Sequence, residues 1–214
     1  MDLLWIKTNP FIKNIFSNYV WTIPNNEKKV FLTFDDGPIP QVTEWVLAQL
    51  ETYQCKATFF CIGNNIEKHP ELFSRLIAEG HEIGNHTFNH VKGWNTPNKT
   101  FFKEVDMCDE FIQKSSSGNR QSKLFRPPYG KIKLSQSRKL RKLGYKIIMW
   151  DVLSADYKKE ISKEKCLENV LNNIESGSII VFHDSIKAFQ NLEFVLPKTL
   201  QFLSENGYKC EIIH

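Results

Sequence analysis

Apolar and polar positions follow two different periods in alternation along the chain. Short apolar runs rich in β-branched and aromatic residues, such as 29–34, predict buried strands, whereas apolar residues spaced three and four apart, as in 98–114, predict helices. The expected strands are 29–34, 57–61, 81–84, 123–126, 145–152, 178–183 and 208–213, and the expected helices are 40–53, 65–79, 98–114, 134–143, 162–175 and 188–205. This alternation predicts an α/β fold with a parallel sheet, and the seven strands suggest a barrel that is short of eight.

The first 28 residues stand outside this alternation. They carry many apolar side chains, but Asp2 and Lys7 bracket the first short apolar run, and no long uninterrupted one follows. We therefore expect no secretory signal and no transmembrane span, and by default a cytoplasmic protein. The expected organisation is an arm, 1–28, that packs on a single barrel domain, 29–214; a membrane-surface role for the arm is the alternative.

Composition limits the function classes. The 214 residues, 41% hydrophobic and 24% charged, suit one globular domain. The net charge is +4, and the basic run 138–142 fits the solvated face of a helix, because no aromatic residues are interleaved as in a nucleic-acid site. Five cysteines without a CxxC pair argue against a disulfide framework or a cysteine–zinc site and favour buried thiols.

The strand expected at 29–34 ends at two adjacent carboxylates, Asp35 and Asp36, followed by Gly37 and Pro38. Two like charges side by side are unfavourable unless a cation lies close to them. One interpretation is that one aspartate binds a metal ion while the other transfers protons. The alternative is an Asp-Gly turn at the end of a strand.

Two histidines follow another expected strand. His86 and His90 are spaced i and i+4, which places them on one face of a helical turn where they can share a metal ion. Thr87 stands where the HExxH motif has glutamate, so this is not the metalloprotease pattern. Together with Asp36 they would form a two-histidine, one-carboxylate site, which hydrolytic zinc and non-haem iron share. An isolated H-x-x-x-H pattern also arises by chance.

Arg126 ends a further expected strand and is followed by two prolines, Tyr129 and Gly130. This rigid presentation of a permanent cation suggests a bidentate partner for an aspartate that must stay ionised. The N–H groups of the Tyr129–Gly130 turn could face a developing oxyanion. A stiff loop without chemistry is the alternative.

His183 ends the expected strand 178–183 and is a candidate general acid, with Asp156 or Asp151 to orient it. A lone histidine would more simply be a satisfied core residue. Here, however, five strand ends carry aspartate, histidine or arginine. Packing alone does not require polar groups at every strand end.

These five segments resemble, in the same order, the five motifs of the polysaccharide deacetylases, carbohydrate esterase family four. That family includes chitin, peptidoglycan and nodulation-type chitooligosaccharide deacetylases. The segments are Thr33-Phe-Asp-Asp-Gly37, His86-Thr-Phe-Asn-His90, Arg126-Pro-Pro-Tyr-Gly130, Trp150 to Asp156, and Val181-Phe-His183. The resemblance implies a distorted (β/α)7 barrel, with 29–214 as its catalytic domain. It also implies a divalent metal, usually zinc, with Co²⁺, Mn²⁺ or Ni²⁺ as alternatives.

The resemblance implies a role for each matching residue. Asp36, His86 and His90 would hold the metal. Asp35 would be the general base that takes a proton from the metal-activated water. Arg126 would pair with Asp35 and keep it charged.

The other matching residues would act on the substrate. The backbone N–H of Tyr129 would share the oxyanion with the metal. Asp156 would support His183, which would protonate the departing sugar amine. Trp150 and Val181 would line a small pocket for the acetyl methyl group.

The chain departs from the family pattern at three positions. Tyr157 follows Asp156 where the family has tryptophan, Leu153 replaces a frequent acidic residue, and Val181 replaces leucine. These changes affect the acetyl pocket and the support of the acid more than metal binding.

The implied activity is metal-dependent removal of N-acetyl groups from oligo- or polysaccharides that contain N-acetylglucosamine, with no nucleic-acid partner. The alternatives are an O-acetyl carbohydrate esterase and a non-catalytic carbohydrate-binding barrel. Filled catalytic positions argue against the second. A non-haem iron oxygenase would have no use for the aspartate pair and Arg126.

Overall fold

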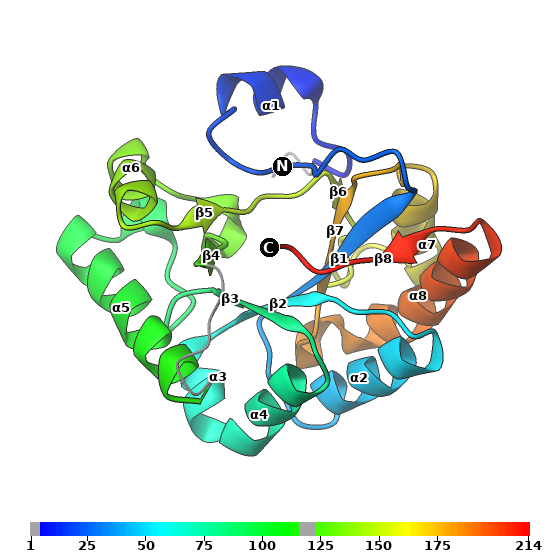
Figure 1. Cartoon of the computed structure of the whole chain (residues 1–214), viewed down its shortest axis with the longest axis horizontal. Coiled ribbons are helices and arrows are strands. Elements are labelled where there is room, and N and C mark those ends of the chain that lie inside the picture. The colour runs from blue at the N-terminus through cyan, green and yellow to red at the C-terminus, as the bar shows by residue number, and fades with distance from the viewer. Residues whose placement is uncertain (1–4, 116–122) are drawn as a thin grey trace.

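The computed structural model describes residues 5–115 and 123–214, and within them the strands form one curled, wholly parallel sheet (Figure 1). The strand order is β5-β4-β3-β2-β1-β7-β6, and β8 pairs separately with the start of β1. The strands are β1 Lys29–Asp35, β2 Thr58–Cys61, β3 Glu82–Asn85, β4 Leu124–Phe125, β5 Lys146–Ile147, β6 Val152–Leu153, β7 Ile179–His183 and β8 Lys209–Cys210. The predicted α/β barrel is therefore confirmed, as a single domain.

The helices lie around the outside of the curled sheet (Figure 1). They are α1 Pro10–Ile15, α2 Val42–Thr52, α3 Gly63–Lys68, α4 Pro70–Ala78, α5 Asn98–Ser115, α6 Leu134–Lys142, α7 Lys163–Leu171 and α8 Ile186–Glu205. The single helix predicted over 65–79 is two helices, because Pro70 has no N–H to continue the first helix and instead begins the second. No helix in the described ranges is both long and apolar enough to cross a bilayer.

β1 lies between β2 and β7 and also pairs with β8, so it contacts three strands of the sheet. Its outward side chains, Val30, Leu32 and Phe34, are buried against the surrounding helices. Phe31 faces inward and packs in a second apolar cluster with residues of β2, β4 and β7. Because side chains alternate along a strand, Thr33 and Asp35 face inward as well. Asp35 lies in register with residues of β2 and β7, so the carboxyl ends of these strands meet at one edge.

The strand predicted over 145–152 is interrupted, and the N-terminal segment fills the interruption. β5 and β6 do not pair with each other; instead Val20 forms a parallel bridge with Ile148. The Val20 N–H donates to the Ile147 carbonyl and the Met149 N–H donates to the Val20 carbonyl, both at 2.8 Å. Residues 148–151 therefore bond both to the N-terminal segment and to the strands on either side, because the Ile148 N–H donates to Phe125 of β4 and the Asp151 N–H donates to Ile179 of β7. Residues 1–4 of the predicted arm lie outside the described residues.

Asp151 bonds to the N-terminal segment and not to the site. Its fully buried carboxylate accepts from Lys7 Nζ at 2.7 Å, from Ser178 Oγ at 2.6 Å and from Lys13 Nζ. Because a buried carboxylate needs paired charges and hydrogen bonds, these contacts fix the segment against the barrel. Of the two aspartates considered for His183, Asp151 is thereby occupied elsewhere.

Candidate active site

Asp35 and Arg126 form a buried ion pair inside the barrel. Arg126 Nη1 donates to Asp35 Oδ1 and to Thr33 Oγ1, each at 2.7 Å, and Nη2 donates to the Met149 carbonyl at 2.8 Å. The guanidinium also lies 4.1 Å from the centroid of the Phe60 ring. The contact with the carboxylate is through one nitrogen, so the expectation of a bidentate pair is wrong. The other donors hold the guanidinium in place through Thr33 and backbone carbonyls.

This pair sets the charge of Asp35. Burial alone would raise the pKa of Asp35, but the positive charge of Arg126, with a smaller contribution from His183, outweighs burial and lowers it below the ordinary value of 3.8. Arg126 stays charged as well, because its ordinary pKa lies far above neutrality. Asp35 is therefore an ionised carboxylate in a water-poor interior, able to accept a proton.

Asp36 follows directly but lies in a different environment. Its φ of 86° is in the left-handed region, which aspartate tolerates better than most residues and which turns the chain at the end of β1. Asn65 Nδ2 donates to the Asp36 carbonyl at 2.7 Å and holds this turn. The Asp36 side chain is half-buried beside His86 and His90, apart from the Asp35–Arg126 pair.

His86 and His90 converge through a tight turn rather than on the face of a helix. Residues 86–90 contain no helix, and both Thr87 and His90 have positive φ, 64° and 55°. The Thr87 N–H donates to Asn85 Oδ1 at 2.9 Å, which helps to hold the turn. The two imidazole centroids lie 5.0 Å apart. The expected helical face is wrong, but the expected convergence is observed.

Three residues fit a divalent metal ion. Ligand atoms of Asp36, His86 and His90 all lie within 4.8 Å of one another, the one group of this kind among residues 5–115 and 123–214. His86 Nδ1 lies 2.7 Å from the Arg126 carbonyl, which places the proton on Nδ1 and leaves the Nε2 lone pair facing Asp36. Burial lowers the pKa of His86 to about 4 and also lowers that of His90. Both rings are thus neutral, as metal binding requires.

His183 differs from His86 and His90, because its surroundings raise its pKa instead of lowering it. Its Nδ1 lies 2.7 Å from Asp156 Oδ1, and its backbone N–H donates to Asp156 Oδ2 at 2.8 Å. Burial would lower the pKa of His183, but the Asp156 carboxylate, helped by Asp36 and Asp35, raises it to about 9. At neutral pH His183 is therefore an imidazolium whose Nε2 proton can be donated. The choice left open between Asp151 and Asp156 falls on Asp156.

The remaining expected residues surround this centre. Tyr129 has φ 59°, and its ring centroid is 4.6 Å from that of His90. The Gly130 N–H donates to the Pro127 carbonyl, so of the two N–H groups in this turn only that of Tyr129 makes no hydrogen bond within the described chain. A Cβ on Gly130 would lie 2.6 Å from Trp150, which shows that the indole packs directly on the turn. Val181 is buried on the same face of β7 as His183.

Asp184 is a residue of the site that the sequence pattern did not reveal. Its Oδ1 accepts from the Gly37 N–H at 3.0 Å and its Oδ2 from Thr43 Oγ1 at 2.6 Å. A Cβ on Gly37 would lie 1.9 Å from Asp184 Oδ2, so only glycine permits this approach. Asp184 therefore fixes the turn that follows Asp35 and Asp36. The only sequence signal was its position after His183, because its partners are 141 and 147 residues away.

Comparison with known proteins agrees with this geometry. The family model described as polysaccharide deacetylase matches residues 22–148. A peptidoglycan-N-acetylglucosamine deacetylase of Bacillus cereus is 34% identical over 88% of each chain. The peptidoglycan-N-acetylmuramic acid deacetylase PdaC of Bacillus subtilis is 32% identical over 88% of this chain. The chain spans only 38% of PdaC and 60% of a second Bacillus cereus deacetylase.

Solved structures show the same fold. The Bc1960 peptidoglycan N-acetylglucosamine deacetylase, in complex with 4-naphthalen-1-yl-N-oxidanyl-benzamide, superimposes with a TM-score of 0.87 over 96% of this chain and 95% of that one, at 30% identity. A Bacillus anthracis protein described as a family-four pseudoenzyme has a TM-score of 0.79 at 22% identity, a likeness of fold alone. The matched residues and the relatives together show that the chain belongs to the polysaccharide deacetylase family and is a hydrolase of that family.

Proposed function

We propose that this protein is a metal-dependent N-deacetylase that removes acetyl groups from oligo- or polysaccharides containing N-acetylglucosamine. One observation carries the proposal. An ionised carboxylate, Asp35, and a protonated imidazole, His183, lie in register on neighbouring strands beside a two-histidine, one-carboxylate group. In this proposal Asp35 is the base, His183 is the acid, and the two-histidine, one-carboxylate group is the metal site.

Amide hydrolysis requires all three. An acetamide is a poor electrophile, and its nitrogen leaves only when it is protonated. A divalent metal held by Asp36, His86 and His90, which we propose is zinc, would supply a Lewis acid for the carbonyl and lower the pKa of a bound water.

The chain's own residues perform the proton transfers. Asp35 accepts a proton from the attacking water, and Arg126 keeps Asp35 ionised until then. The Tyr129 N–H donates to the oxyanion as the carbonyl carbon becomes tetrahedral. His183 then donates its Nε2 proton to the sugar nitrogen, and Asp156 stabilises the imidazolium before that step. We assign the acetyl methyl group to the surface formed by Trp150 and Val181.

The relatives support the choice of substrate class. The relatives include peptidoglycan deacetylases of Bacillus cereus and Bacillus subtilis, and a chitooligosaccharide deacetylase of Azorhizobium caulinodans is 30% identical over 76% of each chain. These substrates share an acetamide on a hexosamine ring. We therefore propose N-acetylglucosamine units as the substrate.

The test measures two products in one reaction. Zinc-loaded protein is given N-acetylglucosamine oligomers, peptidoglycan fragments and acetylated xylan, and released acetate and new primary amine are both quantified. The proposal predicts equal amounts of the two from at least one hexosamine substrate. Asp35→Asn, the control, should retain the metal and lose about 10²–10⁴-fold in rate.

Each other outcome contradicts the proposal in a distinct way. Acetate without amine, from acetylated xylan alone, would identify an O-acetyl esterase. Neither product from metal-loaded protein would favour a carbohydrate-binding barrel. Loss of the metal from Asp35→Asn would show that Asp35 is a ligand and not the base.

A further inference from the structure

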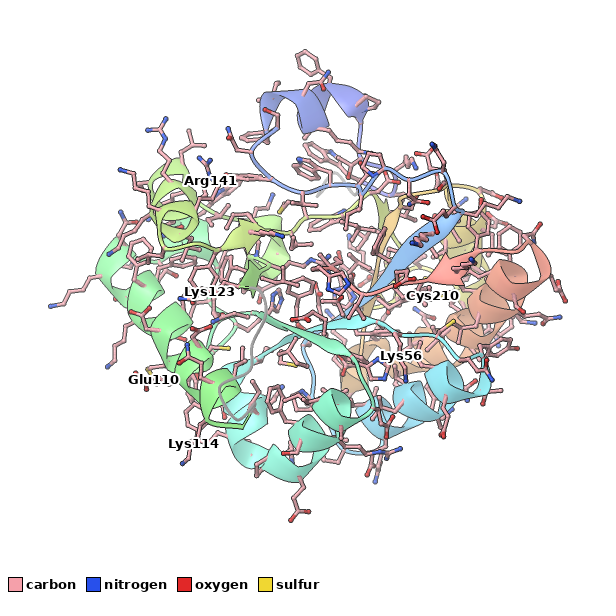
Figure 2. The ribbon with its side chains drawn as sticks, in the orientation of Figure 1. Lys56, Glu110, Lys114, Lys123, Arg141 and Cys210 are labelled. Carbon is pink, nitrogen blue, oxygen red and sulfur yellow. The ribbon has the colours of Figure 1, made fainter. Side chains whose placement is uncertain are left out.

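Two of the five cysteines lie beside each other although 155 residues separate them in the chain. Cys55 lies in the turn between α2 and β2, and Cys210 ends β8; their Sγ atoms are 2.8 Å apart. Figure 2 labels Cys210 on β8 and, on the same side of the molecule, Lys56, the neighbour of Cys55. A covalent S–S bond measures about 2.05 Å, so the sulfurs need to move by less than about 1 Å to form one.

Both segments are held in place by backbone hydrogen bonds. The Cys55 N–H donates to the Leu50 carbonyl at 2.9 Å, which closes the end of α2. Cys210 lies in register with Val30, and the Glu211 N–H donates to the Val30 carbonyl at 3.0 Å. The contact between the sulfurs is therefore part of the packed fold and not a chance approach of two mobile loops.

We propose that Cys55 and Cys210 are a redox site, which closes to a disulfide by exchange with an external disulfide such as oxidised glutathione and ties β8 to the turn before β2. The inference rests on the placement of the two thiols and is independent of the proposed deacetylase activity. Nothing in the catalytic constellation uses either residue.

The chemistry is thiol–disulfide exchange in two steps. The thiolate of one protein cysteine attacks one sulfur of the external disulfide and releases one thiolate. The thiolate of the other cysteine then attacks the protein sulfur of the mixed disulfide and releases the second. The two protein thiols lose two protons and two electrons, and the external disulfide is reduced to two thiols.

The two thiols of the pair differ in exposure and in pKa. Cys55 is buried and Cys210 is half-buried. The hydrogen bond between the thiols lowers the pKa of Cys55, against the opposing effect of burial, and raises that of Cys210. Because the thiolate is the nucleophile in exchange, Cys55 is the thiol of the free pair that ionises more readily. Cys166 provides a contrast, because burial raises its pKa to about 11.

The bond would affect stability and not catalysis. β8 pairs with Lys29 and Val30 at the start of β1, whereas Asp35 lies at the other end of that strand. A crosslink that closes a long loop restricts the unfolded chain, so the oxidised protein should be the more stable form. Such a bond persists in oxidising surroundings and is reduced in a thiol-rich cytosol.

The experiment compares zinc-loaded protein incubated with oxidised glutathione or with a reductant. We expect free thiols to fall from five to three, a 55–210 crosslinked peptide in the non-reducing digest, and a melting temperature about 5–10 °C higher. Acetate release should differ by less than about twofold between the two forms.

Three variants make the result decisive. Cys55→Ser and Cys210→Ser should each lose the crosslink and the rise in melting temperature. Cys166→Ala, which removes a buried thiol outside the pair, should retain both. A glutathione adduct without the crosslink, unreacted thiols, or a crosslink without a rise in melting temperature would overturn the proposal.

Discussion

The histidines on the two sides of β1 make Nδ1 hydrogen bonds of the same length to different acceptors. On the β3 side, His86 Nδ1 lies 2.7 Å from the Arg126 carbonyl; on the β7 side, His183 Nδ1 lies 2.7 Å from the Asp156 carboxylate. Burial lowers the pKa of His86 to about 4, whereas Asp156 overcomes burial and raises that of His183 to about 9.

The difference shows that the acceptor, not the ring or its depth, assigns the role. A carbonyl carries no net charge and leaves the desolvated ring neutral, with a lone pair available to a metal. A carboxylate at the same distance stabilises the imidazolium and leaves a proton available to a leaving group. One residue type thus provides a ligand after β3 and an acid at the end of β7.

The largest predicted effect follows from removing a metal ligand, His86 or His90. His86→Ala and His90→Ala should each remove the metal on dialysis and lower kcat/KM by more than about 10⁴-fold, because the Lewis acid is lost with the ligand. Metal content by elemental analysis, together with the acetate assay, checks this. His81→Asn is the matched control, because His81 is also buried and its pKa is also lowered to about 4, but it bonds to the Ala57 N–H. Full metal occupancy in both alanine variants would disprove the ligand assignment.

The second-largest predicted effect follows from removing the general acid, His183. His183→Ala should retain one metal ion per chain and lower kcat by about 10²–10⁴-fold, the usual contribution of a positioned general acid. An activated aryl ester of acetic acid should recover much of the lost rate, because its phenolate departs without a proton. If the variant loses its metal instead, His183 is a metal ligand rather than the general acid, and the contrast between His86 and His183 does not hold.

The third prediction concerns Asp156, the carboxylate that lies against His183 Nδ1. Asp156→Asn keeps the side-chain shape but removes the charge that raises the pKa of His183. If that pKa returns to 6.5, the protonated fraction at pH 8 falls about 30-fold, and the basic limb of the kcat/KM profile moves from near pH 9 toward pH 6.5. Asp151→Asn is the matched control, a buried carboxylate bonded to Lys7 that should leave the basic limb in place.

Asp156→Asn should also change how the free energy of unfolding depends on pH. The folded-state pKa of His183, about 9, exceeds its unfolded value of 6.5, so its pairing with Asp156 stabilises the fold fully below pH 6.5 and loses that effect as the pH rises through 9. The difference in unfolding free energy between the wild type and Asp156→Asn should therefore be about 3 kcal/mol near pH 6 and shrink toward pH 10. Urea unfolding at several pH values measures it, and a pH-independent difference would mean that Asp156 acts only as a packing residue.

The sequence predicted where the chemistry lies because parallel strands deliver their carboxyl ends to one edge. Asp35, Arg126 and His183 were identifiable as polar residues at the ends of apolar runs, and the structure brings all three into one barrel. Asp36, His86 and His90 were expected to converge, and their ligand atoms do so. These features depend on local pattern and strand order, which a sequence carries directly.

The features that were missed depend on contacts between distant segments. The turn at His86–His90 uses positive φ at non-glycine residues, which residue preferences do not indicate. The interruption after β5 reflects pairing with Val20, more than a hundred residues earlier. Asp184 reads as an ordinary acidic residue until the fold brings Gly37 and Thr43 against it.

The smallest predicted effect concerns Tyr157, whose ring packs against His183. The centroids of Tyr157 and His183 lie 4.7 Å apart in an edge-on contact, and Tyr157 stands where the family more often has tryptophan. Tyr157→Leu removes the ring and has two opposing effects on the pKa of His183. Reduced burial of His183 would raise that pKa, whereas water admitted beside His183 would weaken the attraction of Asp156 and so lower the pKa. Because these effects oppose each other, and an aromatic pair is worth about 0.5–1.5 kcal/mol, the basic limb should move by less than about one pH unit and kcat by less than about fivefold. Tyr157→Trp, the conservative control, should match the wild type in the same pH profile. A shift in Tyr157→Leu as large as that in Asp156→Asn would mean that exclusion of water, rather than the carboxylate, makes His183 an acid.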